Sequence, residues 1–456
     1  MSDFLLGEEQ LQALDLMKEF ITSSNVTAFS LVGPAGTGKT SIIKELLQWI
    51  RKNKIPYILC APTNKAGLVL REITGDKDVT TIHKLLTLTP NLEIFELNFN
   101  ELEFQIKNPM NLGIPHNGVV ICDEASMIND ELFKTIIHHA TLYNSRVIFV
   151  GDKAQLQPVN ANKVSKVFNL DNRFELTKIY RQSSENAILP ILCELREKPI
   201  LSFSQKLAEE GSLYCFTDTK EFVKPAYKVY KEAIREGDIL KTKILAYTNK
   251  RVEAYNKCMK RLLFNNESEY NKGEFLTAYE NLDTSMTIYN SMDYIIASEP
   301  TKVDIKIHKF GISLPGYVLE LYDSFFDKTG TIRILSKDID KSYFLGIADF
   351  IEGTRLDAIE LKERGWYKKS KMRWVDYFKA MDSFTTPVDL YIGNRLVRSK
   401  SFDYGYAIST HKSQGSSLDT VFVDIKNINT CRNIDERRQL QYVALSRTRS
   451  NAYILQ

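Results

Sequence analysis

The residues best suited to chemistry form one short run, Gly33-Pro34-Ala35-Gly36-Thr37-Gly38-Lys39-Thr40. Its pattern is G-x-x-x-x-G-K-T, in which glycines let successive backbone N–H groups point into one concavity. The lysine neutralises the β- and γ-phosphates of a nucleotide, and the hydroxyl after it ligates Mg²⁺. An apolar run, residues 28–32, precedes the loop, and a helical pattern, residues 41–51, follows it. This strand–loop–helix context predicts an ATP and Mg²⁺ site, with Lys39 catalytic and Thr40 on the metal.

Two carboxylates, Asp123 and Glu124, end a second apolar run, residues 119–122. We predict that Asp123 holds Mg²⁺ and that Glu124 orients and deprotonates the attacking water. The pair favours a hydrolase over a small-molecule kinase, because a kinase has no need of a water-activating carboxylate. The plain alternative is an acidic turn at the end of a strand.

Three more side chains could complete a nucleotide site. Gln155 follows the apolar run 146–150 and could sense a γ-phosphate through its amide. Arg181 is a candidate arginine finger, which would stabilise charge on the transferring phosphoryl group. Gln10, near the start of a helical pattern over residues 8–21, could pair with the donor and acceptor edges of adenine, or be a surface glutamine.

Polar loops follow apolar runs in both halves of the chain. They carry hydroxyl, amide and ammonium donors, which suit a phosphodiester backbone, although each loop alone could equally cap a helix. The side chains that we predict to contact DNA are Pro62, Thr63, Asn64, Lys65, Thr81, His83, Thr248 and Asn249.

A hairpin is predicted within residues 92–107, where apolar residues alternate in two runs around Asn100-Glu101. A hairpin inserted into an alternating strand–helix domain must project from it, with Phe99 at its tip. The alternative is a hairpin that folds back onto the core.

A second insertion is predicted within residues 275–400, where short β-like runs among Gly and Pro indicate a small β-barrel. These runs are residues 305–307, 317–321, 331–334 and 343–345. Residues 362–373 then carry six basic residues and one acid, with Trp366 and Tyr367. This mixture either binds a single strand by phosphate pairing and base stacking or packs on a neighbouring domain.

Composition sets outer bounds. The chain has 456 residues, so two to four domains are expected. The net charge of +3 does not by itself indicate a polyanionic partner. Six scattered cysteines without a C-x-x-C pair, and neither a signal peptide nor a membrane span, predict a cytoplasmic protein with reduced thiols.

In sequence order, the motifs G-P-A-G-T-G-K-T, A-P-T-N-K-A, D-E-A-S, G-D-x-x-Q-L-x-P-V and Y-R-Q resemble those of superfamily 1 helicases. The pattern is similar to the RecD/Pif1-like branch, superfamily 1B, and to its Dda-type members from T-even phages. Residues 406–416 resemble motif V of that branch and residues 442–449 its motif VI. Together the matches span Gln10 to Arg449.

The resemblance implies further site residues. Gln414, Gly415 and Arg447 would complete the nucleotide site, with Arg447 as a second arginine finger reaching across a cleft. Thr410 and His411 would contact DNA. In Dda-type proteins the insertion corresponding to residues 362–373 is a tower that contacts the hairpin domain.

The expected fold is α/β, with two RecA-like parallel-sheet domains, an inserted β-hairpin and an inserted SH3-like β-barrel with an extended arm. The expected bounds are 1–87 and 109–182 for the first domain, 88–108 for the hairpin, 183–268 and 400–456 for the second domain, 269–399 for the barrel, and about 355–385 for the arm.

The expected function is an ATP-dependent DNA helicase that moves on single-stranded DNA. The resemblance implies 5′-to-3′ polarity, forked DNA as substrate, a monomer, and a host-cell location if a phage encodes the protein; a single-strand-binding or replisome protein is a further partner. The alternatives are an RNA helicase or single-strand translocase of the same superfamily, a non-motor P-loop phosphotransferase, and a binding protein with an inactive ATPase.

Overall fold

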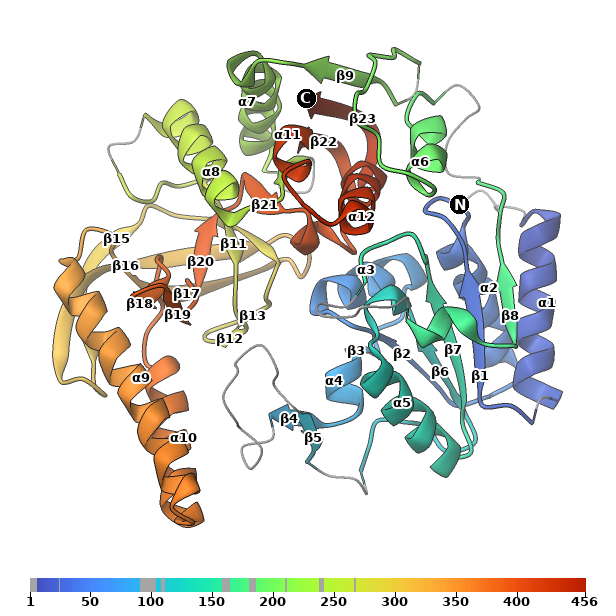
Figure 1. Ribbon diagram of the computed structural model, residues 1–456, viewed down its shortest axis with the longest axis horizontal. Coiled ribbons are helices and arrows are strands. Elements are labelled where there is room, and N and C mark those ends of the chain that lie inside the picture. Colours follow the sequence, from blue (N-terminus) through green and yellow to red (C-terminus); the bar gives the residue numbers. More distant parts are fainter. Residues whose placement is uncertain are drawn as a thin grey trace.

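The computed structural model describes residues 6–23, 25–90, 104–107, 111–157, 165–179, 186–209, 211–237, 242–265 and 268–456. Phe99, Arg181 and the expected turn at residues 100–101 lie outside these ranges. Figure 1 shows two sheets with helices packed around them, a third sheet beside the second of these, and a helical arm that projects away.

The first α/β domain is built on a six-stranded sheet of order β3-β2-β6-β7-β1-β8, in which every pair is parallel. Its central strands are continuous apolar runs because helices cover both faces. The strands are β1 (Ala28–Val32), β2 (Tyr57–Ala61), β3 (Val79–Thr81), β6 (Val119–Cys122), β7 (Arg146–Gly151) and β8 (Arg173–Glu175). The helices are α1 (Glu8–Ser23), α2 (Lys39–Lys52), α3 (Asn64–Thr74), α4 (Ile82–Leu85) and α5 (Asp130–Leu142), with short 3₁₀ helices η1 (Ala125–Met127) and η2 (Lys166–Asn169).

The second α/β domain has a five-stranded parallel sheet of order β21-β10-β22-β23-β9. Its strands are β9 (Leu213–Phe216), β10 (Thr242–Ala246), β21 (Ala407–Ser409), β22 (Leu418–Asp424) and β23 (Thr448–Leu455). Its helices are α6 (Leu189–Leu195), α7 (Thr219–Glu236), α8 (Asn249–Phe264), α11 (Ile425–Ile428) and α12 (Ile434–Ser446), with the 3₁₀ helix η3 (His411–Ser413). Two parallel-sheet domains in one chain agree with the predicted α/β class.

An antiparallel sheet, the inserted sheet, interrupts the second domain between α8 and β21. Its strands are β11 (Phe275–Ala278), β14 (Asp293–Ile296), β15 (Thr301–Ile307), β16 (Ile312–Asp323), β17 (Lys328–Leu335) and β20 (Phe402–Tyr404), with a small ribbon of β12 (Leu282–Asp283) and β13 (Thr287–Ile288) beside it. Because β20 pairs with β11, the insertion extends to Tyr404, beyond the predicted limit of residue 399. The pairings among the described residues form an open sheet, so a closed SH3-like barrel stays a prediction.

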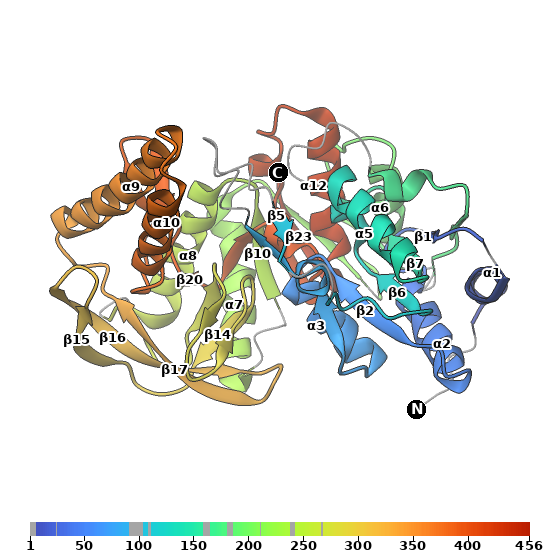
Figure 2. The ribbon, with the colours of Figure 1, turned by 90° about the horizontal axis from the view of Figure 1, so that it is seen from below.

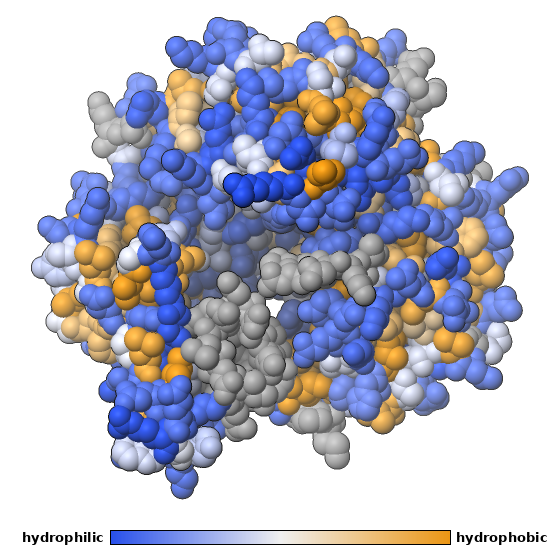
Figure 3. Space-filling view, viewed as in Figure 1, coloured by the Kyte–Doolittle hydropathy of each residue, from blue (hydrophilic) through white to orange (hydrophobic). Residues whose placement is uncertain are grey.

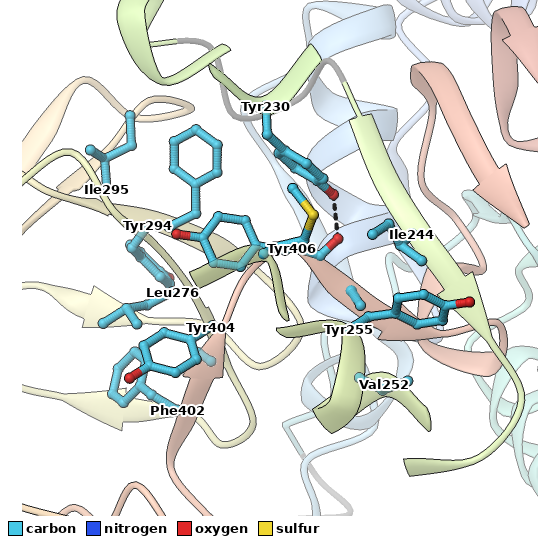
Figure 4. Close-up of a cluster of buried hydrophobic side chains, with 14 of the residues drawn as sticks. Tyr230, Ile244, Val252, Tyr255, Leu276, Tyr294, Ile295, Phe402, Tyr404 and Tyr406 are labelled. Carbon is cyan, nitrogen blue, oxygen red and sulfur yellow. Dashed lines mark hydrogen bonds between the residues drawn. The ribbon is translucent and has the colours of Figure 1, made fainter. Parts of the chain in front are cut away.

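The inserted sheet and the second α/β domain share one hydrophobic core. Tyr230 of α7 donates a hydrogen bond to the backbone oxygen of Tyr406, next to Leu276 and Tyr294 of the inserted sheet (Figure 4). A common core of this kind fixes the two parts in one orientation.

The arm is a pair of packed helices, α9 (Lys341–Glu363) and α10 (Tyr367–Met381) (Figure 2). The ribbon of β18 (Leu390–Ile392) and β19 (Arg395–Arg398) follows it (Figure 1). The arm begins well before the predicted residue 355, and the strand predicted at residues 343–345 is wrong. Asp340 caps α9 by accepting from Ser342 N–H, and Phe344, Ile347 and Ile351 recur at helical spacing. A run of three apolar residues fits a strand and a helix equally well, so it could not identify the helix.

Two short antiparallel strands occupy the segment where the hairpin was expected: β4 (Leu88–Pro90) and β5 (Phe104–Ile106), with Leu88 opposite Ile106. The residues between them lie outside the described ranges. The projecting wedge therefore stays a prediction. Among the described residues, no helix is long and apolar enough to span a membrane.

Candidate nucleotide site and nucleic-acid surface

The P-loop joins β1 to α2 as the sequence predicted. Gly38 has φ 79° and lies against Gln10, whose amide nitrogen would be only 2.1 Å from a Cβ at this position. The positive φ would strain any other residue here, and a Cβ would also displace the Gln10 amide from the P-loop, so glycine is strongly favoured. Lys39 begins α2, and its Nζ donates to the backbone oxygens of Gly33 at 2.7 Å and Pro34 at 2.8 Å.

Gln10 positions the P-loop. Its side chain is fully buried, accepts from Gly7 N–H at 2.9 Å and donates to Thr37 O at 3.0 Å. In this arrangement the amide is occupied by Gly7 and Thr37, and its pairing with adenine stays a prediction.

The two predicted carboxylates stand at the end of β6, beside Lys39. Asp123 Oδ1 accepts from the backbone N–H of Glu124 at 2.9 Å. Burial, and then the neighbouring Glu124 carboxylate, raise the pKa of Asp123 to about 7. Glu124 has φ 50°, a conformation uncommon outside glycine, and its Oε2 is buried without a hydrogen-bond partner among the described residues.

These features suit a magnesium–nucleotide complex. The described residues contain no cluster of three or more His, Cys, Asp or Glu that could hold a metal alone. Mg²⁺ is, however, commonly bound by one or two protein oxygens together with substrate phosphates. Thr40 and Asp123 can supply these oxygens, and the unpaired Glu124 Oε2 provides an acceptor for a water.

The Lys39 ammonium group interacts electrostatically with the carboxylates around the P-loop. Burial lowers the pKa of this group, and three carboxylates oppose that shift: those of Asp152, Glu124 and Asp123. The sequence predicted all these positions except Asp152.

Gln414 of the second domain joins the site across the interface, as the resemblance implied. Its Nε2 donates to Gln155 Oε1 at 3.2 Å and to Ser126 Oγ at 3.1 Å. Gly415, with φ 76°, lies directly against Ala66 of α3. The loop after β21 thus contacts three motifs of the first domain at once, through Ser126, Gln155 and Ala66.

Arg447 does not reach the P-loop. Its guanidinium is buried and donates to Val443 O, Ser416 O and Ser446 Oγ, all within the second domain. Its predicted role as a finger therefore requires a rearrangement that this structure does not contain.

A cavity of about 560 Å³ adjoins the P-loop between the two domains. Its wall includes Pro34 and Leu176 from the first domain and Arg196 and Arg438 from the second. This volume is in the range of small-molecule sites, and the wall carries the basic residues Lys153, Arg196 and Arg438 beside the acidic residues Glu175 and Glu197.

Sequence reasoning missed one cluster at this interface. Arg196 Nη1 is 2.7 Å from Asp152 Oδ1, and the Tyr442 hydroxyl donates to Asp152 Oδ2 at 2.5 Å. Tyr442 also accepts from the backbone N–H of Ala35 at 3.1 Å. Asp152 and Tyr442 lie within recognised motifs, but Arg196 follows α6 in a stretch without any motif.

The loops predicted to contact DNA lie at the carboxyl ends of neighbouring strands. In the first domain, Ala61 of β2 is paired with Thr81 of β3, which brings their following loops together. Thr63 Oγ caps α3 by accepting from Ala66 N–H, and Thr81 Oγ caps α4 by accepting from Lys84 N–H. The capping alternative is therefore confirmed for both threonines, and their contact with DNA stays a prediction.

The other residues of this group are partly enclosed. Asn64 donates to Asn281 of the insertion at 3.1 Å. Burial lowers the pKa of Lys65, and the Asp293 carboxylate of the insertion opposes that shift. Burial also lowers the pKa of His83, and Pro62 is half-buried.

The corresponding loops of the second domain behave differently from one another. Thr248 caps α8 by accepting from Arg251 N–H, Asn249 is exposed, and the exposed His411 is 3.4 Å from Glu436. Thr410 is completely buried, and its hydroxyl donates to Ala246 O at 3.3 Å. Thr410 therefore presents no exposed surface in this arrangement, and its contact with DNA stays a prediction.

In the space-filling view, the recess between the upper and lower parts of the molecule is lined mainly by hydrophilic residues (Figure 3). The far end of the arm is hydrophilic as well. There Trp366 and Tyr367 are exposed, whereas Trp374 is buried between the helices, so the arm's aromatic residues divide between surface and core.

Comparisons with known proteins agree with this architecture. Residues 5–218 match a family described as an AAA domain, and residues 404–455 match the UvrD-like helicase C-terminal domain. The ATP-dependent DNA helicase dda of Enterobacteria phage T4 is 26% identical over 98% of both chains. The RecBCD enzyme subunit RecD of Buchnera aphidicola is 26% identical over 95% of this chain and 71% of that protein.

The crystal structure of the Pif1 helicase from Candida albicans has the same fold, with a TM-score of 0.50 at 15% identity over 99% of this chain and 94% of that one. From its motifs, its paired parallel-sheet domains and these matches, the chain belongs to the RecD/Pif1-like branch of superfamily 1 helicases and is similar to the Dda-type members.

Proposed function

We propose that this protein is an ATP-dependent DNA helicase that moves 5′-to-3′ on single-stranded DNA and separates duplex DNA ahead of it. The observation that carries this proposal is the convergence of Lys39, Asp123, Glu124 and Gln414 at one interface between two parallel-sheet domains. A site of this kind can convert phosphate chemistry into domain movement, because its two walls belong to separate bodies.

Each residue has a defined task in this proposal. Lys39 binds the terminal phosphates. Thr40 and Asp123 would hold Mg²⁺, which when bound would neutralise charge on the phosphate oxygens. Glu124 accepts a proton from the attacking water, through a carboxylate whose Oε2 is buried without a hydrogen-bond partner among the described residues. Gln155 senses the γ-phosphate, and Arg181 and Arg447 remain the proposed fingers.

Nucleic acid is proposed to lie along the carboxyl ends of both parallel sheets. The loops at Thr63 and Thr81 in one domain, and at Thr248 and His411 in the other, offer two holds on one strand. Two holds whose separation changes with each nucleotide cycle would give stepwise movement. The hairpin with Phe99 at its tip is the proposed wedge, and changing that tip should reduce unwinding while sparing DNA-stimulated ATPase.

DNA as the substrate is supported by relatives, since the phage T4 protein is named an ATP-dependent DNA helicase. The polarity and the forked substrate rest on the family resemblance. We also propose that the protein acts as a monomer, with a single-strand-binding or replisome protein as a further partner.

ATP hydrolysis measured with a DNA oligomer, an RNA oligomer of the same length and no nucleic acid tests the proposal. We expect strong stimulation by DNA, weak stimulation by RNA and none in a Lys39→Ala variant. Equal turnover without nucleic acid would favour the phosphotransferase. Preferential stimulation by RNA would identify an RNA helicase instead.

A further inference from the structure

The side chain of Tyr442 crosses from the second domain into the P-loop of the first. It projects from α12 and is 1% exposed. Its hydroxyl accepts from the Ala35 N–H at 3.1 Å and donates to Asp152 Oδ2 at 2.5 Å. One phenol thus connects a P-loop amide with a carboxylate at the end of β7.

The carboxylate of Asp152 is fixed from both sides. Its Oδ1 accepts from Arg196 Nη1 at 2.7 Å and from Ala154 N–H at 3.0 Å. The Arg196 guanidinium also lies 5.8 Å from the centre of the Tyr442 ring. Arg438 Nη1 donates a hydrogen bond to the backbone oxygen of Arg196 at 2.8 Å. Asp152 therefore accepts from two groups of the second domain, Arg196 and Tyr442.

The direction of these hydrogen bonds follows from the chemistry. A carboxylate can only accept, so the phenol must donate to Asp152 and keep its lone pairs for Ala35 N–H. Burial, and then the Asp152 carboxylate, raise the pKa of Tyr442, so its proton stays in place. The Ala35 amide lies in the loop that must also present its N–H groups to phosphate.

We propose that Tyr442 is a positioning residue that couples occupancy of the P-loop to the orientation of the second domain. In this arrangement, which rests on the proposed function, the phenol ties Ala35 to Asp152 and Arg196. A polyphosphate and Tyr442 then compete for the same stretch of P-loop amides. Coupling between two binding sites is reciprocal. Nucleotide binding at the P-loop therefore changes the affinity for the DNA strand through Tyr442.

The perturbation that tests this link is Tyr442→Phe, which keeps the ring beside Arg196 but removes the hydroxyl, and with it the hydrogen bond that the hydroxyl accepts from Arg196 Nη1 at 3.4 Å. A hydrogen bond to a buried charged group corresponds to a factor of about 10 to 100 in an equilibrium constant. The matched control is Tyr453→Phe, because Tyr453 stacks on Phe422 within the second domain, away from the interface.

The first readout is amide hydrogen exchange of the P-loop in the free protein. We expect exchange at Ala35, whose acceptor is the neutral phenol, to rise about 2- to 10-fold in Tyr442→Phe and to stay unchanged in Tyr453→Phe. Unchanged exchange in Tyr442→Phe, or an equal rise in both variants, would overturn the proposal. This readout does not depend on any activity of the protein.

The second readout is the ratio of oligo(dT) dissociation constants measured with and without a non-hydrolysable ATP analogue. We expect Tyr442→Phe to move this ratio at least about tenfold towards one, with little change in DNA affinity of the free protein. A ratio equal to that of the wild type would show a purely structural role and refute the coupling. If the wild type binds no DNA while Ala35 still exchanges faster in Tyr442→Phe, the proposed function fails and the interdomain link stands.

Discussion

Replacing Asp293 by alanine tests how the inserted sheet is fixed to the second α/β domain. Asp293 of β14 is 2.9 Å from Lys243 Nζ of β10, and the two side chains are 5% and 2% exposed. Thr277 donates to the same carboxylate, and Lys243 also donates to Gly405 O. Asp293→Ala leaves a buried ammonium without its counter-charge, which costs about 3–5 kcal/mol.

A variant that removes both charges should behave differently. Lys243→Met with Asp293→Leu replaces the pair by apolar side chains of similar volume, which is often neutral or stabilising. The surface control is Glu253→Ala, which breaks the Lys257–Glu253 pair, 68% and 50% exposed. Its cost should lie below about 1 kcal/mol.

The assay is urea unfolding followed by circular dichroism and tryptophan fluorescence. The expected order of stability is wild type and double variant together, then Glu253→Ala slightly lower, and Asp293→Ala far lower. A decrease in the free energy of unfolding below about 1 kcal/mol for Asp293→Ala would show that Lys243 does not depend on Asp293 as its counter-charge. A buried ammonium group without a partner destabilises the fold by more than that.

Three further outcomes concern the site. Glu124→Gln should lower kcat for ATP about 10²- to 10⁴-fold with little change in KM, whereas a normal kcat would remove Glu124 from the proposed proton transfer. Gln414→Ala deletes two hydrogen bonds across the interface, each worth about 1 kcal/mol, so kcat/KM should fall about 30-fold; a change below about twofold would contradict that bridge. Thr410→Val should keep single-stranded DNA affinity within about twofold while lowering stability by about 1 kcal/mol, and a tenfold loss of affinity would restore Thr410 as a DNA contact.

The parts of the site that the sequence predicted are local. The P-loop needs only a strand, glycines and a helix in succession, and Asp123 and Glu124 follow one apolar run directly. The parallel sheets could also be predicted from the sequence, because strands buried on both faces are continuous apolar runs.

The parts it missed depend on distant segments. Ala35, Asp152, Arg196 and Tyr442 come together from four places in the chain, and nothing near Arg196 signals its partner. Thr63 illustrates a second difficulty, since a threonine before a helix satisfies both a cap and a phosphate-contact pattern.

The arm shows how short apolar runs mislead. Residues 343–345 are apolar in succession, which fits a buried strand or a helix equally well. Only the longer spacing through Ile347 and Ile351, with the Asp340 cap, identifies the helix.

The central claim is that ATP hydrolysis between the two domains drives movement along DNA. Strand separation of a duplex with a 5′ single-stranded tail, measured with ATP and Mg²⁺ beside a 3′-tailed duplex, tests it most directly. We expect rapid separation of the 5′-tailed duplex by the wild type and none by Lys39→Ala. Separation no faster than in Lys39→Ala would contradict the claim, and separation of the 3′-tailed duplex alone would reverse the proposed polarity.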